Sequence, residues 1–309
     1  MWFYGIWLDS VGKAAIESLM RPICIVYLYP KLEIRLSRPI LVFDSGIGGL
    51  SVLAEIRKSL PDSDYCYLFD NARLPYGELE EQVLISGCVE LVCDLVARTN
   101  AMIVVVACNT ASTVVLPALR AHLTVPVVGV VPAIKPAALM SKSKRIGLLA
   151  TPGTVKRHYT HELISQFADD CHVELFGCSE LVMMAEQKVA TGMLDMHRLA
   201  QLLAPVVAAQ LDVLVLGCTH FPMIKAELQQ VLGAGVKLMD SGAAIAKRVV
   251  TLLTQQNLIM EDHRVTDERE AVRESVMQAF YTKVGISEGL TTTLIDCGFS
   301  TIERITTTN

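Results

Sequence analysis

Two short apolar runs, Met102–Val106 and Val213–Leu216, constrain the fold of this chain more than any other feature. Both are too short for a buried helix and rich in β-branched residues, so we predict that both are central strands of parallel sheets. Each run is closely followed by a cysteine, Cys108 or Cys218. Because ligands of open α/β sheets bind at the carboxyl ends of the strands, both thiols are candidate active-site groups.

The pattern of strand ends recurs along the chain. The predicted strand ends at Asp44 and Thr151 lie 107 residues apart, and the two cysteines lie 110 residues apart. Gly129 and Asp240, each assigned to a later strand, are separated by 111 residues. Three strand ends at nearly one offset indicate a duplicated α/β unit. We therefore expect two similar domains, each a mostly parallel sheet flanked by helices, pseudo-twofold related, with the active site in the cleft between them.

Composition narrows the class of function. The net charge of −5 argues against a dedicated nucleic-acid binder, because no basic stripe would neutralise phosphates. The nine cysteines are an odd number without CxxC pairs, which favours a reducing cytoplasm. His158 with His161, and Cys171 with His172, lack a second pair at zinc-site spacing, so no metal site is expected.

The two ends of the chain differ from its middle. Residues 1–38 hold both tryptophans, and charged residues interrupt their apolar stretches, so neither a secretory signal nor a membrane span is expected. We interpret this stretch as a leader outside the fold, with the native start near Leu36. The polar stretch Asn257–Arg273 is predicted to be a linker or an exposed helix. Phe280–Val284 and Thr292–Asp296 are predicted to be late edge strands.

Polar motifs follow other predicted strands. The strand Pro39–Phe43 leads into a glycine-rich turn at residues 44–49, which lacks the residues of a P-loop or a dinucleotide fingerprint. We expect this turn to hold a carboxylate through its amide groups and the Ser45 hydroxyl. The sequence of Pro75–Gly77 is equally compatible with a role in the site and with an ordinary turn. A helix over Ser179–Gln187 carries Glu186 near the expected site.

Four motifs together, DSGIGG (44–49), PYG (75–77), CNTAS (108–112) and GCTHFP (217–222), resemble those of the glutamate racemases, within the aspartate/glutamate racemase family. The resemblance covers about residues 39–256. It implies cofactor-independent interconversion of L- and D-glutamate for peptidoglycan synthesis in the cytoplasm, with a small-molecule substrate, no metal, no nucleic acid and no membrane. It also implies a first domain of residues 39–132 plus 241–309 and a second of residues 133–240. A homodimer is compatible with this organisation.

The resemblance also implies roles for individual residues. Cys108 would take the α-proton from D-glutamate and Cys218 from L-glutamate. Asp44 and His220 would assist the thiols and contact the substrate, with Glu186 as a further candidate. The substrate's carboxylates and ammonium would be held by the polar residues of the four motifs, namely Ser45, Tyr76, Gly77, Asn109, Thr110 and Thr219, and Thr151 and Thr154 would contribute.

Two cysteines suit such chemistry because inversion through a planar carbanion needs a base on one face and an acid on the other. A free thiol has a pKa near ~8.5, so one thiol needs a neighbour that favours the thiolate. Two other functions stay open at this point. The first is a racemase of the same plan that acts on aspartate or a hydantoin. The second is a module that binds a ligand without catalysis. A structural alternative also stays open, in which both cysteines are small core residues.

Overall fold

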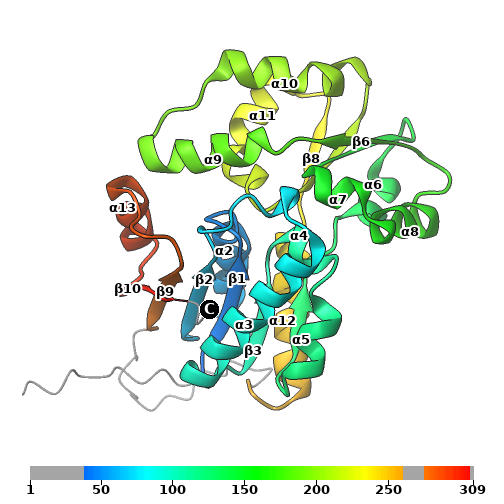
Figure 1. The fold of residues 1–309 in the computed structure, drawn as a ribbon. Coiled ribbons are helices and arrows are strands. Elements are labelled where there is room, and N and C mark those ends of the chain that lie inside the picture. Colours follow the sequence, from blue (N-terminus) through cyan, green and yellow to red (C-terminus); the bar gives the residue numbers. More distant parts are fainter. Residues whose placement is uncertain (1–37, 260–274, 307–309) are drawn as a thin grey trace, which may run out of the picture. The chain divides into compact units, whose positions relative to one another are not determined.

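A computed structural model describes residues 38–259 and 275–306, which belong to one compact unit. They form two fully parallel sheets, one of six strands and one of four (Figure 1). The first sheet has the spatial order β10 (Thr301–Arg304), β9 (Met277–Tyr281), β2 (Tyr65–Phe69), β1 (Ile40–Asp44), β3 (Ile103–Val106), β4 (Val127–Gly129). The second has the order β6 (His172–Gly177), β5 (Arg145–Ala150), β7 (Val213–Gly217), β8 (Lys237–Met239).

The strand order is repeated between the sheets. The order β2-β1-β3-β4 in the first sheet matches β6-β5-β7-β8 in the second, and β9 and β10 extend the first sheet beyond β2. In each repeat the first strand lies at the centre, between the second and the third. The predicted duplication and the predicted α/β class are therefore confirmed, and the strands at the two cysteines are where the sequence places them.

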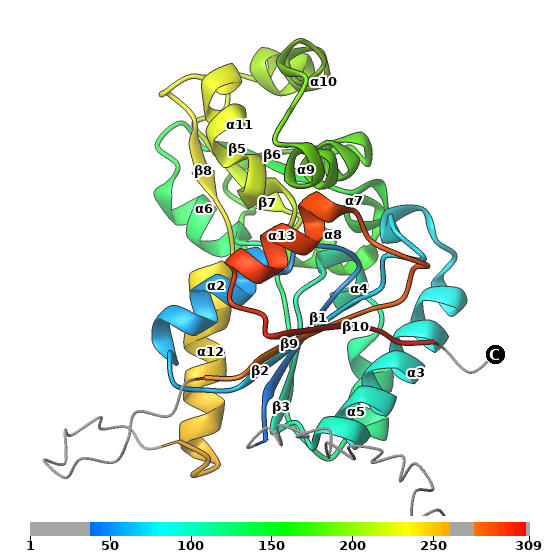
Figure 2. The ribbon, with the colours of Figure 1, turned by 90° about the vertical axis from the view of Figure 1, so that its left-hand side faces the viewer.

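Helices cover both faces of each sheet (Figures 1 and 2). On the six-stranded sheet, one face packs against α2 (Leu50–Ser59), α12 (Gly242–Gln255) and α13 (Glu288–Asp296), and the other against α3 (Glu81–Thr99), α4 (Asn109–Ser112) and α5 (Leu116–His122). On the four-stranded sheet, one face packs against α9 (Glu180–Thr191), α10 (Met196–Ala208) and α11 (Lys225–Leu232), and the other against α6 (Ile134–Met140), α7 (Pro152–Lys156) and α8 (His158–Phe167). Two 3-10 turns complete the elements, η1 (Tyr76–Glu78) and η2 (Phe221–Ile224).

The spacing of apolar residues explains the helices. In α2, Leu50, Leu53 and Ile56 recur every three residues, and all three are buried against the sheet. Such a stripe is what an amphipathic helix needs to bury one side. The α3 helix ends at Thr99 and is capped by Asn100, whose φ of 53° lies in the left-handed region that asparagine tolerates.

Two expectations for the C-terminal part are corrected. The residues Thr292–Asp296, predicted to be a strand, form the end of α13. The Ser287 hydroxyl accepts a hydrogen bond from Leu290 N at the start of this helix, and Leu290 and Leu294, one turn apart, are buried. The strand predicted at Phe280–Val284 overlaps β9 only at Phe280 and Tyr281, and β9 lies inside the sheet because β10 forms the edge. The predicted leader, apart from Arg38, and most of the predicted linker lie outside the described residues.

The chain crosses between the sheets twice, after β4 and after β8. The two crossings are joined by a hydrogen bond of 2.6 Å from the Ser241 hydroxyl to the carbonyl oxygen of Val131. Within the described ranges, every helix is too short or too polar to span a lipid bilayer.

Candidate active site

The polar residues singled out from the sequence gather at the carboxyl ends of four strands. Asp44 is the last residue of β1, and Thr151 directly follows β5. Cys108 lies two residues after β3, and Cys218 directly follows β7. All four residues are buried. Because parallel strands end at the same edge of their sheet, both halves present their polar residues at equivalent positions.

The two halves meet through a pair of crossed contacts. The Thr219 hydroxyl, after Cys218, donates to the Asp44 carboxylate at the end of β1, with both oxygens at 3.3 Å. The hydroxyls of Thr110, after Cys108, and Thr151, at the end of β5, are 2.9 Å apart. In both cases the end of one half's first strand contacts the segment after the other half's cysteine. A twofold relation between two units produces this reciprocal pattern.

Cys218 faces an imidazole. Its sulfur lies 3.7 Å from Nδ1 of His220, and Nε2 of His220 lies 2.7 Å from Oε1 of Glu186. The same Glu186 oxygen accepts a hydrogen bond of 2.9 Å from the backbone N–H of Ile47. Burial lowers the pKa of His220, but its hydrogen bonds to Cys218 and Glu186, with the charges of both, raise that pKa well above its usual value. This arrangement favours an imidazolium between two groups that can carry negative charge.

Asp44 lies in the glycine-rich turn that leads from β1 to α2. Burial raises its pKa, against the lowering effects of the His220 charge and of the backbone N–H groups of Gly49 and Ser45. The hydrogen bond from Gly49 N to Asp44 Oδ2 measures 2.7 Å. Two amides of the turn, those of Ile47 and Gly49, thus bind carboxylates of the protein itself. This changes the expectation that the turn holds a substrate carboxylate through its amide groups.

The glycines of this turn allow a close approach to the other half. A Cβ atom on Gly48 would lie 2.6 Å from atoms of Thr219 and His220, and one on Gly46 would overlap the Glu186 carboxylate. The sequence suggested that these glycines let a backbone approach a ligand. In the structure, they let the turn pack against the His220 imidazole, which lies beside Cys218, and against the Glu186 carboxylate, which contacts that imidazole.

Cys108 has different neighbours. Its thiol donates to the Ser45 hydroxyl at a sulfur–oxygen distance of 3.7 Å. Burial raises the pKa of Cys108 well above its usual value, and the charge of Asp44 raises it further, against the lowering effect of the hydrogen bonds that Cys108 shares with Ala111 N and the Ser45 hydroxyl. The raised pKa of Cys108 favours the protonated thiol at neutral pH.

A cavity of about 310 Å³ opens beside these residues and is lined by Asn109, Cys218 and Thr219, together with Ser51, Glu55, Lys225 and Asp240. The side-chain oxygen of Asn109 is buried and has no hydrogen-bond partner among the described residues. A buried acceptor without a partner costs free energy, so it is available to a donor on a ligand. The volume is in the range of small-molecule sites.

The model of the Asp/Glu/Hydantoin racemase family matches residues 48–249 of this chain. The chain belongs to that family. It is 92% identical over 274 residues to the glutamate racemase of Shewanella baltica strain OS195, a match that covers 89% of this chain and 100% of the relative. It is 77% identical to the glutamate racemase of Shewanella oneidensis, over 89% of this chain and 98% of the relative.

A solved structure agrees with these sequence comparisons. Escherichia coli glutamate racemase, crystallised with L-glutamate and the activator UDP-MurNAc-ala, has a TM-score of 0.79 and 45% sequence identity to this chain. The match covers 88% of this chain and all of the E. coli chain. The resemblance deduced from the four motifs is therefore confirmed.

Other predicted site residues of this racemase-family chain are placed as follows. The Thr154 hydroxyl joins those of Thr110 and Thr151, at 3.3 and 3.1 Å, in a buried cluster that we call the threonine cluster. Gly77 packs against it, because a Cβ on Gly77 would lie 2.7 Å from Cβ of Thr151. The Tyr76 hydroxyl donates to Asp70 at 2.5 Å and makes no hydrogen bond to the cluster's hydroxyls in the described residues, so it is the backbone of this segment that meets the cluster.

Sequence reasoning missed two polar residues near the site. Ser51 donates to the backbone oxygen of Thr219 at 3.1 Å and lines the cavity. Asp70 directly follows β2, so the strand-end rule that found Asp44 would also have found it. Across residues 38–259 and 275–306, no three His, Cys, Asp or Glu side chains are grouped as metal ligands.

Proposed function

We propose that this chain interconverts L- and D-glutamate without a cofactor, with Cys108 and Cys218 as the two acid/base groups. One observation carries the proposal: two buried thiols follow equivalent strands of the two halves, and hydrogen bonds between the halves join the strand-end residues beside them. The identity to glutamate racemases supports glutamate as the substrate. The product would supply D-glutamate for peptidoglycan synthesis in the cytoplasm.

The proton balance is simple. For L-glutamate, the Cys218 thiolate takes the α-proton, so the C–H bond breaks, an S–H bond forms and the electron pair stays on the α-carbon. The Cys108 thiol then gives its proton to the opposite face and becomes the thiolate. The reverse reaction starts with Cys108. The raised pKa of Cys108 and the imidazolium of His220 beside Cys218 support this starting state, with a thiol on one side and a stabilised thiolate on the other.

The activation free energy of α-proton removal shows how much stabilisation the surrounding residues must supply. A turnover of ~10 per second corresponds to a barrier of about 16 kcal/mol. Each pKa unit between the α-carbon and the thiol costs about 1.4 kcal/mol. Hydrogen bonds to the α-carboxylate and a retained ammonium must therefore stabilise the carbanion. We assign this work to Ser45 and Thr219, with Asp44, His220 and Glu186 controlling the protonation of the thiols.

The remaining groups of the substrate have natural partners. The side-chain oxygen of Asn109, which has no partner within the part of the chain that the structure describes, suits the ammonium. The threonine cluster offers three hydroxyls whose hydrogens can rotate toward a carboxylate. None of these three hydroxyls is bonded to Cys108 or Cys218 in the hydrogen bonds of the described residues, so we assign the cluster, together with the Tyr76–Gly77 backbone, to the carboxylate farther from the reacting carbon.

We also propose that the catalytic unit consists of a first domain of residues 39–132 and 241–309 and a second domain of residues 133–240. The polar contacts between β1, β3, β5 and β7 support a substrate position between them. All groups named in the mechanism come from one chain, so the proposal holds for a monomer and for a homodimer.

The direct test is circular dichroism of L-glutamate incubated with purified protein and no added cofactor. We expect the signal to decay to zero, and we expect aspartate and hydantoins to keep theirs. In deuterated water, the product should be labelled before the recovered substrate, because each face has its own base. Equal early labelling of both enantiomers would contradict the two-base mechanism. Glutamate binding without exchange of the α-proton would instead favour a binding module.

A further inference from the structure

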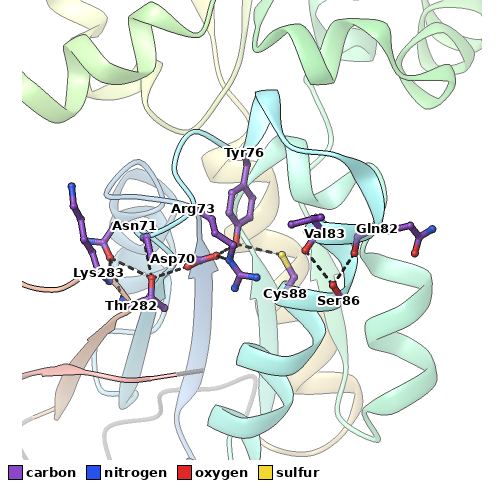
Figure 3. A network of polar contacts seen from close by, with 11 residues as sticks. Asp70, Asn71, Arg73, Tyr76, Gln82, Val83, Ser86, Cys88, Thr282 and Lys283 are labelled. Atoms are coloured by element: carbon purple, nitrogen blue, oxygen red, sulfur yellow. Dashed lines mark hydrogen bonds and ion pairs between the residues drawn. The ribbon is translucent and has the colours of Figure 1, made fainter. Parts of the chain in front are cut away.

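A second polar network lies beside the proposed site, centred on Asp70 (Figure 3). Asp70 is fully buried at the end of β2 and accepts three side-chain hydrogen bonds. Tyr76 Oη and Arg73 Nε each donate to Oδ2 at 2.5 Å, and Thr282 Oγ1 donates to Oδ1 at 2.7 Å. A buried carboxylate with three donors is well satisfied, and its loss would leave those donors without a partner.

The donors come from two distant parts of the chain. Arg73 and Tyr76 lie in the loop after β2, whereas Thr282 follows β9 in the C-terminal segment. The link is reinforced because Ala72 N donates to the Thr282 hydroxyl at 3.0 Å. Asn71 Oδ1 also accepts from the backbone N–H groups of Thr282 and Lys283, at 3.2 and 2.9 Å. The C-terminal segment therefore holds the loop at several points.

The other end of this loop reaches the threonine cluster. A Cβ atom on Gly77 would lie 2.7 Å from Thr151, and a Cβ on Gly153 would lie 2.9 Å from the Gly77 carbonyl oxygen. The backbone at Gly77 is thus in close contact with the segment Thr151–Gly153. Any shift of Tyr76 changes where Gly77 meets Thr151.

Near neutral pH, the hydrogen bonds from Cys88 to Tyr76 and from Tyr76 to Asp70 keep the same donors and acceptors. Burial, together with the charges of Cys88 and Asp70, raises the pKa of Tyr76 well above its usual value. Burial likewise raises the pKa of Cys88 to about 12, and its thiol donates to Tyr76 Oη at 3.6 Å. Figure 3 shows this order, with Cys88 beyond the Tyr76 hydroxyl and Thr282 on the other side of Asp70. The phenol keeps its proton and keeps donating to Asp70.

We propose that Asp70 is a positioning residue: with Thr282, it fixes the Tyr76–Gly77 segment against the threonine cluster, so that the site for the distal carboxylate of the substrate is formed before binding. The inference rests on the proposed function. It gives the C-terminal segment a part in substrate affinity, although the proposed function assigns none of its residues to substrate binding. The distal carboxylate keeps its charge through the reaction, so its binding energy is common to the ground and transition states and appears in KM.

Thr282→Val tests this, because valine keeps the shape and removes only the hydroxyl. We expect KM for glutamate to rise about tenfold with kcat within about twofold of the parent, since a hydrogen bond to a buried charge is lost. Thr282→Ser, which restores the hydroxyl, should return KM to the parent value. Thr293→Val is the matched control, because the Thr293 hydroxyl bonds only to the Gly289 carbonyl within α13 among the described contacts. It should leave KM unchanged.

If Thr282→Val does not fold, Tyr76→Phe removes a different donor to Asp70 and should show the same rise in KM. An unchanged KM in a folded variant, or a fall in kcat alone, would overturn the positioning role. The parent protein is assayed first, which separates the two proposals. A parent without racemisation contradicts the proposed function and this inference with it, whereas an active parent with unaffected variants contradicts the inference alone.

Discussion

The two crossed contacts between the halves join corresponding segments, the end of one first strand and the residues after the other cysteine, but they differ in chemistry. At one, Asp44 meets Thr219, beside the ion pair of His220 and Glu186. At the other, Thr151 meets Thr110, and only neutral hydroxyls are involved. Counting from each cysteine, Thr110 and His220 occupy the same position in their halves. The two ends of the site therefore differ in charge. We call the end with Asp44, His220 and Glu186 the charged pole, and the end with Thr110 and Thr151 the hydroxyl pole.

This difference has a chemical consequence. A symmetric backbone explains why two thiols lie at equivalent strand ends. It does not orient a substrate, because symmetric surroundings would accept a ligand in either direction. The charged pole suits the reacting carbon with its ammonium and carboxylate, and the hydroxyl pole suits a carboxylate that takes no part in proton transfer. The asymmetry thus supports both the orientation of glutamate and the distinct protonation of the two thiols.

Removing either thiol should have the largest effect. Cys108→Ala or Cys218→Ala is expected to lower turnover in both directions by about 10³-fold or more, because each direction needs both an acid and a base. Polarimetric assays of both enantiomers measure this, with circular dichroism as the check of folding. Cys93→Ala, at a half-buried cysteine in α3, is the control and should retain activity. Unchanged turnover in either active-site variant would remove that cysteine from the mechanism.

Weakening the charged pole should have the next largest effect. In Glu186→Gln, the neutral amide no longer favours the imidazolium, so the pKa of His220 should fall, and turnover should fall about tenfold. The folded-state pKa of His220 is raised, so its contribution to stability is full below the unfolded value near ~6.5 and is lost as the pH rises through the folded value. In the variant, this loss should occur at lower pH.

NMR titration of the His220 ring and thermal unfolding across pH measure the two effects. Glu180→Gln is the control, because Glu180 is also on α9 but pairs with the exposed Arg198. A pKa of His220 that is the same in Glu186→Gln and in the parent would show that Glu186 does not control the imidazole.

Asp44→Asn addresses the other thiol. The charge of Asp44 raises the pKa of Cys108, so its removal should lower that pKa and increase the thiolate fraction at a given pH. We expect Cys108 to be alkylated by iodoacetamide several-fold faster near pH 8, as resolved by peptide mass spectrometry. Cys88, which is equally buried, provides the internal reference. Slower alkylation in the variant would show that Asp44 favours the thiolate instead.

The smallest effect is expected at Ser112, which has no hydroxyl counterpart because Pro222 occupies the equivalent position in the second half. Its hydroxyl donates to the Val106 carbonyl and accepts from Val130 N, both at 3.0 Å, and so joins the ends of β3 and β4. Ser112→Ala should lower the free energy of unfolding by about 1–3 kcal/mol, because two buried backbone groups lose a partner. Turnover should stay within about twofold. Urea denaturation measures the change, and an unchanged midpoint would contradict it.

Much of the architecture could be predicted from local patterns. The strands β1, β3 and β7 are short, apolar and β-branched, and the sequence places each within about two residues of its position in the structure. β6 was missed because it is only half buried and its composition is mixed. The threonines at 291–293 favour a strand by propensity, but the packing of Leu290 and Leu294 makes that segment helical.

The sequence predicted which residues form the candidate site better than it predicted how their side chains are oriented. The residues at strand ends, among them Asp44, Cys108 and Cys218, follow from the parallel topology. The direction of a side chain does not, and Tyr76 shows this, because its hydroxyl binds Asp70 and not the threonine cluster. A helical glutamate is exposed by default, and only the structure places Glu186 against His220.

The sequence by itself determined that two cysteines end equivalent strands of a duplicated α/β unit, because strand patterns and spacing are local properties. The tertiary structure alone decided which polar groups surround each thiol. Glu186 binds Ile47 across 139 residues of sequence, and Thr219 binds Asp44 across 175. Contacts at such separations depend on how two halves pack, and packing is set by the whole core and not by any one segment.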